Sequence, residues 1–250
     1  MFSPKISVIT IVYNDVTHLE GTILSVIGQS YSNIEYIIID GNSSDGTVDL
    51  IQKYDPQISF WKSEPDKGIY DAMNKGLAVA SGNYVLFLNS GDKLYHPNLF
   101  CEIVDRIDNV LPDVIYGETM IIAEDGTEIG LRRLRPPKEL TGKSLKYGML
   151  VCHQSFLAKR NLVPAYNLKY KLSADYDWML NVLKKSTNIL NSNQIIAGYL
   201  DGGVSKKQMR NSLIERFIIM AHSYGWFSTL FNHLTFAIRI SSFYLRNRRI

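Results

Sequence analysis

The segment Tyr84-Val-Leu-Phe-Leu-Asn-Ser-Gly-Asp92 decides the fold, because a run of strand-forming residues ends abruptly in small polar residues and one carboxylate. Such a continuous apolar run is typical of a strand buried on both faces in a parallel sheet. In open α/β sheets, ligands bind just beyond the carboxyl ends of these strands. We therefore expect Asp92 to lie where a nucleotide or metal ion binds. A strand followed by an ordinary turn is the alternative, and the segment alone does not separate the two.

Strand and helix alternate on both sides of this segment, which predicts an α/β fold with helices flanking a mostly parallel central sheet. Apolar, β-branched runs predict strands at 6–12, 34–40, 58–62, 84–88, 114–122, 128–131, 155–158 and 194–200. Helical spacing predicts helices at 16–29, 45–54, 68–80, 98–107, 175–185 and 208–245, the last broken near Gly225. We expect one domain over 1–202, with a nucleotide-binding half (1–112) and an acceptor-facing half (113–202), and a helical extension over 203–250.

The composition is that of an ordinary globular protein, with 46% hydrophobic and 20% charged residues. Its two cysteines, Cys101 and Cys152, match no metal-binding spacing and indicate a reducing compartment. The N-terminus runs straight into the first predicted strand and lacks the pattern of a signal peptide. We therefore expect a cytoplasmic protein.

The C-terminal segment 203–250 carries a net charge of +7, whereas residues 1–202 carry −4. Its charged residues are Lys206, Lys207, Arg210, Arg216, Arg239, Arg246, Arg248 and Arg249, against the single acid Glu215. Asn232, His233 and Arg239 interrupt its apolar stretch, which is therefore too polar to span a membrane. Aromatic residues and leucines beside arginines predict a helix that lies on an anionic membrane surface. A helix packed on the core with a solvated basic end remains the alternative.

Polar residues follow three of the predicted strands at the same edge of the sheet. Tyr13 and Asn14 follow the first strand, and Asp40 and Asp92 follow the second and fourth. A tyrosine there can stack on a base, and a carboxylate can accept a hydrogen bond from a base or ribose. Packing of the tyrosine on the next helix, and a capping role for Asp40, are the alternatives. Lys67 and Gly68 open a helix whose N-terminus suits an anion, although no phosphate-loop or dinucleotide motif is present.

Several segments together resemble glycosyltransferase family 2, the inverting enzymes with a GT-A fold, and in particular their bacterial O-antigen, capsule and colanic-acid branch. The resemblance is specific in the first hundred residues, in Pro4-Lys-Ile-Ser-Val-Ile-Thr-Ile-Val-Tyr-Asn14, Ile37-Ile-Ile-Asp-Gly-Asn-Ser-Ser-Asp-Gly-Thr47, Asp66-Lys-Gly-Ile-Tyr-Asp-Ala-Met-Asn-Lys-Gly76 and Gly82-Asn-Tyr-Val-Leu-Phe-Leu-Asn-Ser-Gly-Asp92. It continues more weakly in Cys152-His-Gln154, Ser173-Ala-Asp-Tyr-Asp-Trp178 and Gly202-Gly-Val-Ser205.

The resemblance implies that the first half binds a UDP-sugar. Tyr13 would stack on uracil, Asp40 would bind its N3, and Asp92 would bind Mg²⁺ or Mn²⁺. The other residues expected beside the nucleotide-sugar are Ile11, Asn14, Lys67, Gly68, Asn89, Ser90 and Gly91. The chain departs from the family at Asn89 and Gly91, which stand where acids are usual. The metal would then depend mainly on Asp92, the diphosphate and water.

The resemblance also implies that Asp175 is the general base, with Ala174 in place of the family's glutamate. Asp177 competes for this role, but it lies roughly 200° around a helix from Asp175, so both cannot face one site. An acid that merely stabilises a helix N-terminus is the structural alternative for Asp175. Residues expected near the donor or acceptor are His153, Gln154, Asp177 and Trp178.

The predicted function is transfer of a single sugar from a UDP-sugar to a hydroxyl of a polyprenyl-diphosphate-linked saccharide, during synthesis of surface polysaccharide such as lipopolysaccharide O-antigen. A single transfer is favoured because the Gln-x-x-Arg-Trp motif of processive members is absent. We expect peripheral attachment to the inner face of the cytoplasmic membrane and no nucleic-acid partner, and leave a homodimer open. The alternatives are a nucleotidyltransferase, for which Thr10–Asp15 lacks a glycine-rich basic loop, and a non-catalytic sugar-nucleotide- or membrane-binding protein.

Overall fold

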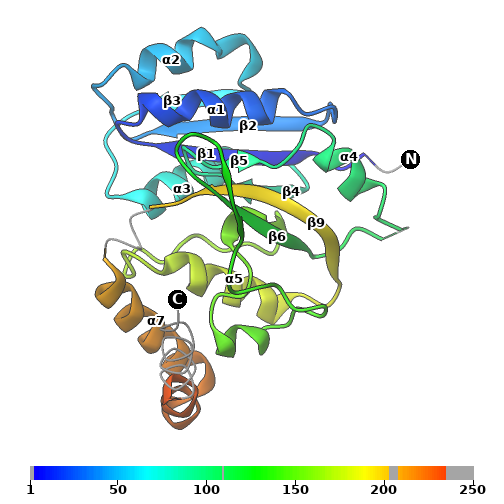
Figure 1. The fold of residues 1–250 in the computed structure, drawn as a ribbon, viewed down its shortest axis with the longest axis vertical. Helices are drawn as coiled ribbons and strands as arrows, with labels where there is room; N and C mark the ends of the chain where they lie inside the picture. Colours follow the sequence, from blue (N-terminus) through cyan, green and yellow to red (C-terminus); the bar gives the residue numbers. More distant parts are fainter. Residues whose placement is uncertain (1–2, 109, 203–207, 235–250) are drawn as a thin grey trace, which may run out of the picture.

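The computed structural model describes residues 3–108, 110–202 and 208–234 (Figure 1). Among these, nine strands form one sheet in the order β3-β2-β1-β4-β8-β6-β9-β5, with β7 paired to β6. The strands are β1 (Ile6–Val12), β2 (Ile34–Asp40), β3 (Phe60–Ser63), β4 (Tyr84–Phe87), β5 (Lys93–Leu94), β6 (Val114–Ile122), β7 (Glu128–Leu131), β8 (Phe156–Lys159) and β9 (Ile189–Leu200). The sheet therefore joins both predicted halves into one body.

Helices cover the two faces of this sheet (Figure 1). They are α1 (Val16–Ile27), α2 (Thr47–Lys53), α3 (Ile69–Val79), α4 (Leu99–Val104), α5 (Ala174–Lys185) and α7 (Met209–Tyr224), with short 3-10 turns η1 (Asp55–Gln57), η2 (Ser144–Tyr147) and η3 (His153–Ser155). Residues 226–234 are helical again after Gly225, which adopts a positive φ of 85°. The predicted break in the C-terminal helical segment is thus confirmed.

Within residues 1–112, strands β1 to β4 pair with one another in parallel, as the strand–helix alternation predicts. β1 pairs in parallel with both β2 and β4, and β2 pairs in parallel with β3. Val12 lies opposite Asp40, while the backbone N–H of Ser90 donates to Ile11 O at 3.1 Å. The carboxyl ends of β1, β2 and β4 therefore meet at one edge, which holds Tyr13, Asp40 and the segment after β4.

Two apolar cores pack on opposite faces of the sheet. One joins β1 and β4 to α3, α5 and α7, and the other joins the same strands to α1, α2 and α4. Alternation along β1 explains this division, since Ile9 and Ile11 belong to the first core and Val8 and Val12 to the second. Gly76 lets α3 approach β1 closely, because a Cβ there would lie 2.4 Å from Ile9 Cγ2.

Residues 113–202 add strands of mixed direction to the sheet. β8 pairs antiparallel with both β4 and β6, whereas β9 runs parallel to β6 and antiparallel to β5. β9 begins at Ile189, earlier than predicted, and the two-residue β5 is too short for its sequence to show a period. The extension is only partly described, because Lys206, Lys207 and residues 235–250 lie outside the described residues.

Candidate active site

The segment Asn89–Asp92, here called the β4 loop, follows β4 and contains Gly91 in a backbone conformation that favours glycine. Gly91 has a φ of +89°, which strains any side chain, and its N–H donates to Thr22 Oγ1 at 2.9 Å. A Cβ on Gly91 would lie only 2.7 Å from Leu200 Cδ2. An acid at this position, which the family usually has, would therefore strain the backbone and require Leu200 to shift.

Asp92 points into the protein and is held by neutral donors from two distant segments. Gln154 Nε2 donates to Asp92 Oδ2 at 2.7 Å, and the N–H of Leu200, at the end of β9, donates to Oδ1 at 3.0 Å. The Cys152 thiol in turn donates to Gln154 Oε1 at 2.7 Å. We call this cluster of Cys152, Gln154, Asp92 and Leu200 the Asp92 latch. Burial raises the pKa of Asp92 to about 6, although the bonds from Leu200 and Gln154 act in the opposite direction.

The residues of the β4 loop do not fit the divalent metal that the sequence predicts. Both oxygens of Asp92 accept hydrogen bonds from the protein, and its side chain is only 3% exposed. Asn89, Ser90 and Gly91 supply no carboxylate, and a hard divalent cation prefers carboxylate oxygens. Within the described residues, no group of three or more His, Cys, Asp or Glu side chains is placed to hold a metal ion. The expected role of Asp92 as a metal ligand is therefore not supported by its surroundings.

The ends of β1 and β2 form a surface edge with one exposed aromatic ring. Tyr13 is 65% exposed, and its ring lies 3.2 Å from the position of a Cβ on Gly41. Asp40, directly before Gly41, is fully buried and accepts hydrogen bonds from Ser43 N at 2.9 Å, Ser43 Oγ and Ser63 Oγ at 2.6 Å. Tyr13 is thus free to stack on a base, whereas Asp40 already organises the loop after β2.

Two further residues of the predicted nucleotide site tie neighbouring loops together. Asn14 adopts a positive φ of 47°, and its Oδ1 accepts a hydrogen bond from Ser44 N at 2.9 Å. Ser90 Oγ donates to Asp15 Oδ2 at 2.7 Å, and the other oxygen of Asp15 pairs with His18 Nδ1. Ile11 contributes its backbone carbonyl, which binds Ser90 N, while its side chain is buried. These contacts join the β4 loop to the start of α1.

Carboxylates of the chain bind the two backbone N–H groups that come just before α3. The N–H of Lys67 donates to Asp71 Oδ2 at 3.0 Å, and that of Gly68 donates to Asp66 Oδ1 at 2.7 Å. These two N–H groups are therefore already occupied. The anion contact expected at Lys67 and Gly68 stays a prediction, to which the exposed side chain of Lys67 can contribute.

A buried histidine and a buried aspartate lie side by side where η3 meets the first turn of α5. His153 Nδ1 is 3.4 Å from Asp175 Oδ2, while Tyr70 OH donates to Asp175 Oδ1 at 3.1 Å. On its other side, His153 Nε2 is 3.5 Å from Asn89 Nδ2 of the β4 loop. Burial raises the pKa of Asp175, but the hydrogen bond and charge of His153 and the charge of Arg216 outweigh it and hold the pKa below its usual value. Asp175 therefore stays ionised in a buried place.

Helix α7 fixes the segment that positions this pair. The Glu215 carboxylate accepts hydrogen bonds from the backbone N–H groups of Lys171, Leu172 and Ser173, each at 2.9 Å. Ser173 Oγ also lies 3.0 Å from Ser212 Oγ. α7 therefore holds the entry to α5, two residues before Asp175.

Asp177 and Trp178, expected near the substrates, have other surroundings. The half-buried Asp177 accepts a hydrogen bond from Asn181 Nδ2 at 3.3 Å. The partners of Asp175 are instead Tyr70, Tyr176 N and His153, as the angular separation of the two acids predicts. Trp178 is 1% exposed, stacks on Tyr166 at a ring distance of 5.3 Å, and donates its indole N–H to Pro164 O. Trp178 is therefore a core residue and does not border the site.

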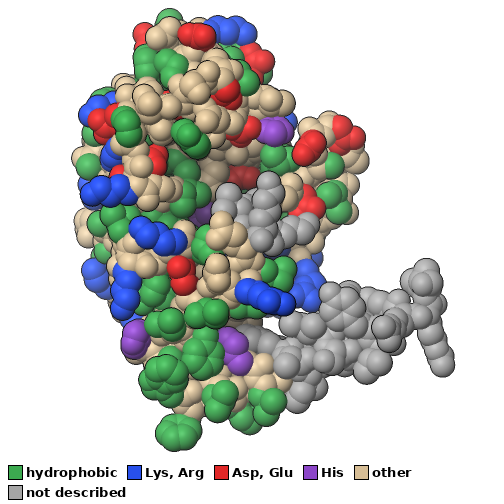
Figure 2. Space-filling model, turned by 90° about the vertical axis from the view of Figure 1, so that its left-hand side faces the viewer, with side chains coloured by type: hydrophobic (Ala, Val, Ile, Leu, Met, Phe, Trp, Pro, Cys, Tyr) green, Lys and Arg blue, Asp and Glu red, His purple; other side chains and the backbone are tan. Residues whose placement is uncertain are grey.

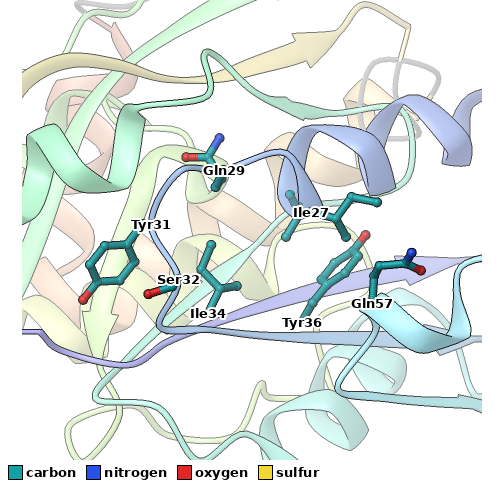
Figure 3. Close-up of a pocket in the computed structure, with 8 residues that line it drawn as sticks. Ile27, Gln29, Tyr31, Ser32, Ile34, Tyr36 and Gln57 are labelled. Carbon is teal, nitrogen blue, oxygen red and sulfur yellow. The ribbon is translucent and has the colours of Figure 1, made fainter.

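A separate surface pocket of about 210 Å³ lies away from these residues. Its lining includes Ile27 at the end of α1, Ile34 at the start of β2, and Gln57 (Figure 3). Because Ile34 begins β2 and Asp40 ends it, this pocket lies at the opposite edge of the sheet from Tyr13 and Asp92. It has no part in the candidate site.

Sequence comparison identifies the family of the chain. The profile of Glycosyl transferase family 2 matches residues 7–164. The chain is a member of glycosyltransferase family 2. It is 35% identical over 184 residues to an uncharacterized glycosyltransferase of Mycobacterium tuberculosis, covering 71% of this chain and 68% of the relative. It is also 30% identical to the putative teichuronic acid biosynthesis glycosyltransferase TuaG of Bacillus subtilis, over 79% of each chain.

Solved structures confirm the GT-A fold. Residues 1–349 of Staphylococcus aureus TarS, in complex with UDP-GlcNAc, match with a TM-score of 0.66 at 17% identity, over 87% of this chain and 66% of TarS. The mannosyltransferase PcManGT of Pyrobaculum calidifontis, in complex with GDP-Man and Mn²⁺, matches with a TM-score of 0.62 at 13% identity, over 95% of this chain and 76% of that one. The family 2 chain is thus a glycosyltransferase by sequence and fold.

Sequence reasoning missed two residues of this family 2 site. Tyr70, whose hydroxyl donates to Asp175, lies in a helix that is predicted from its apolar spacing. That spacing gives no sign that the hydroxyl reaches an acid. Glu215 leaves a clearer signal, because it is the single acid in a strongly basic segment. An isolated acid in such a segment indicates a specific partner, here the backbone before α5.

Proposed function

We propose that the protein transfers a single sugar, with inversion, from a UDP-sugar to a hydroxyl of a lipid-linked saccharide in surface polysaccharide synthesis. The observation that carries this proposal is the buried His153–Asp175 pair, which faces the β4 loop at the carboxyl edge of the parallel half-sheet. The complex of TarS with UDP-GlcNAc supports a nucleotide-sugar donor. The name of TuaG supports a product in the cell envelope.

The chemistry needs a group that accepts the acceptor's proton on the side opposite the leaving diphosphate. As the acceptor oxygen attacks the anomeric carbon, the bond from that carbon to the diphosphate breaks, and UDP leaves with the electron pair. The ionised Asp175, paired with His153, is the predicted site of proton acceptance. Tyr13, exposed at the end of β1, is placed to stack on the base of the donor.

Mn²⁺ or Mg²⁺ would, when bound, neutralise charge on the leaving diphosphate. Because the residues of the β4 loop do not fit such an ion, no step above is assigned to it. The exposed Lys67 supplies a cation at the same edge of the sheet. Dependence of turnover on a metal is therefore a property that the assay below has to measure.

An exposed apolar surface at the C-terminal helices supports contact with a membrane. Residues 226–234 expose large hydrophobic side chains, which gather at the lower end of the molecule in Figure 2: Trp226, Phe227, Leu230, Phe231 and Leu234. Among the described residues, no helix has the length and apolarity needed to cross a bilayer. A helix of this kind, followed in sequence by four arginines, suits peripheral attachment at the inner face of the cytoplasmic membrane, where a polyprenyl-linked acceptor is found.

The test is release of UDP from a panel of UDP-sugars, with and without a lipid-linked acceptor mixture. We expect one donor to release UDP, faster with acceptor, and Asp175→Asn to abolish the acceptor-dependent rate. Parallel reactions with EDTA and with added Mn²⁺ measure metal dependence. Failure of every donor in the presence of acceptor would overturn the proposed function.

A further inference from the structure

We propose that Arg132 and Tyr199 form a subsite for the diphosphate of the UDP-sugar, in which the guanidinium and the phenol hydroxyl bind phosphate oxygens. This inference rests on the proposed transferase function and adds two binding residues to it. The sequence alone singles out neither residue, because Arg132 is one of three arginines in the basic loop 131–137. The pairing of β6 with both β7 and β9 brings their two segments together.

The guanidinium of Arg132 is held in place by the backbone and lacks an anionic partner. Its Nη1 donates to Met149 O at 2.6 Å and to Leu134 O at 3.3 Å. Within the described residues, Nε and Nη2 have no acceptor, and no carboxylate lies within ion-pair distance of this half-buried side chain. Arg135, three positions later, is instead paired with Glu118 through hydrogen bonds of 2.8 and 2.7 Å. Arg132 is therefore an oriented cation with two nitrogens open to a ligand.

The strand register places Arg132 and Tyr199 on the same face of the sheet. The N–H of Arg132 donates to Thr119 O at 2.9 Å, so Arg132 lies opposite Thr119 of β6. On the other side of β6, Tyr199 lies opposite Ile121, two positions after Thr119. Because side chains two positions apart in a strand point to the same face, Tyr199 shares the face of Thr119 and Arg132. Thr119 Oγ1 lies 2.8 Å from Ser155 Oγ of η3, so this face borders the candidate active site.

Electrostatic effects on two neighbouring groups agree with this placement. Burial raises the pKa of Tyr199 to about 12; the charges of Asp92 and Asp201 add to this rise, and the charge of Arg132 opposes it. Burial also raises the pKa of the Cys152 thiol to about 11, and the charge of Arg132 opposes that rise as well. Cys152 belongs to the Asp92 latch, so the guanidinium lies within electrostatic range of the segment that follows β4.

The hydroxyl of Tyr199 is a second open donor beside this cation. The half-buried phenol has no hydrogen-bond partner among the residues that the structure describes. Because its pKa is raised, the hydroxyl keeps its proton at neutral pH and can donate to an anion. The guanidinium and the phenol thus offer a charged and a neutral donor on one face of the sheet.

The position of the two donors favours a diphosphate as the bound anion. Nucleotides bind at the carboxyl edge of the parallel strands in open α/β sheets, and the exposed Tyr13 at the end of β1 is placed for the base. The β4 loop lies at the same edge but does not offer the carboxylates that a divalent ion prefers. A guanidinium fork matches the oxygens of a phosphate in both geometry and charge. Arg132 therefore supplies positive charge to the diphosphate in addition to any bound metal ion.

The test measures equilibrium binding of UDP and of uridine to the full chain by titration calorimetry, in EDTA and again with Mn²⁺. We expect Arg132→Gln to weaken UDP binding by about 10- to 100-fold in EDTA and to leave uridine binding unchanged, because only the phosphate contact is lost. Arg132→Lys keeps the charge without the fork and should recover part of the affinity. Tyr199→Phe removes one hydroxyl, leaves the ring in place and should weaken UDP binding by about three- to tenfold. Arg135→Gln, in the same loop, is the matched control and should stay within about twofold of the wild-type affinity.

A folded Arg132→Gln protein whose UDP affinity stays within about twofold of wild type would overturn the inference. An equal loss of uridine affinity would also overturn it, because the change would then affect the whole nucleotide site. Initial-rate kinetics separates the two substrates: KM for the UDP-sugar should rise about tenfold or more, while KM for the lipid-linked acceptor stays unchanged. A rise confined to the acceptor KM would assign the subsite to an anionic group of the acceptor and overturn the donor assignment. A wild-type protein that neither binds UDP nor releases it from any UDP-sugar would overturn the proposed function itself.

Discussion

Asp92 and Asp175 are two aspartates buried to a similar degree, yet they have opposite electrostatic surroundings. Asp92 is 3% exposed and Asp175 is 7% exposed. Burial raises the pKa of Asp92 to about 6, because its partners are an amide and a backbone N–H. Asp175 has a lowered pKa, because His153 and Arg216 outweigh the same burial. Burial alone therefore does not decide whether a carboxylate is charged; its neighbours do.

The two acids also differ in what they join. The Asp92 latch joins the β4 loop to η3 and β9 through one hydrogen bond on each carboxylate oxygen. Asp175 stays ionised beside His153, whose far ring atom faces the β4 loop. The acid that the sequence makes most conspicuous is thus the one whose charge is stabilised less by its surroundings.

Turnover should show the largest contrast between these acids. Asp175→Asn should lower kcat for UDP release by about 100-fold or more, because the proposed proton acceptor is lost. Asp92→Asn should lower kcat by less than about tenfold in the folded enzyme, because it removes a structural contact. Steady-state kinetics at 25 °C, with circular dichroism to confirm folding, measures both. Loss of all activity in Asp92→Asn, together with loss of a Mn²⁺ response, would restore Asp92 as a metal ligand.

For the free energy of unfolding, unlike for kcat, a change at Asp92 should matter more than a change at Asp175. Asp92→Ala leaves Gln154 Nε2 and Leu200 N buried without their acceptor and should lower the free energy of unfolding by about 2–5 kcal/mol. Asp108→Ala, at an exposed aspartate, should change it by less than about 0.5 kcal/mol. Urea denaturation measures both values. An Asp92→Ala protein as stable as the control would mean that the latch does not hold the β4 loop.

The pH dependence of stability should distinguish the two acids by sign. The folded protein binds a proton at Asp92 more tightly than the unfolded chain does, since its pKa is raised from 3.8 to about 6. The Asp92 contribution to the free energy of unfolding should therefore rise as pH falls from about 6 to 4, by up to about 3 kcal/mol. Asp175, with a lowered pKa, contributes stability above pH 3.8 that is lost as pH falls further. Urea titrations of wild type and Asp92→Asn across this range should differ by the Asp92 component alone, and parallel curves would mean that burial does not raise the pKa of Asp92.

The smallest effect concerns the glycine that accompanies Asp92. Gly91→Asp restores the family's usual acid but places a side chain at a φ of +89°, against Leu200. It should destabilise the protein by about 1–3 kcal/mol without creating a metal response. Gly91→Ala has the same backbone strain without the charge and is the matched control. Mn²⁺-stimulated turnover in Gly91→Asp would show that the β4 loop retains room for an ion.

The parallel part of the fold follows from local patterns of apolar residues that can be read in the sequence. Apolar runs end at Val12, Asp40 and Leu88, and the parallel pairing of their strands brings these ends to one edge. The two-residue β5 has no readable period, and its partner β9 comes about a hundred residues later. Local periodicity is therefore sufficient for the parallel half but not for pairings set by tertiary contact.

The site is less predictable, because its chemistry depends on distant partners. Asp175 is found correctly as a buried acid, but its partner His153 belongs to a separate segment that lies beside it only in the fold. The bonds that occupy Asp92 come from residues 62 and 108 positions away. A single sequence shows which acids are present but not which donors will reach them.

The contacts of Glu215 bear on the order in which parts of the protein fold. It binds the backbone of residues 171–173 from a helix more than forty positions later in the chain. Contacts of such long sequence separation form late, after the local elements. During synthesis the carboxyl edge of the parallel strands can therefore fold while the segment before Asp175 still lacks its support. Docking of α7 is thus a late step that orders the start of α5.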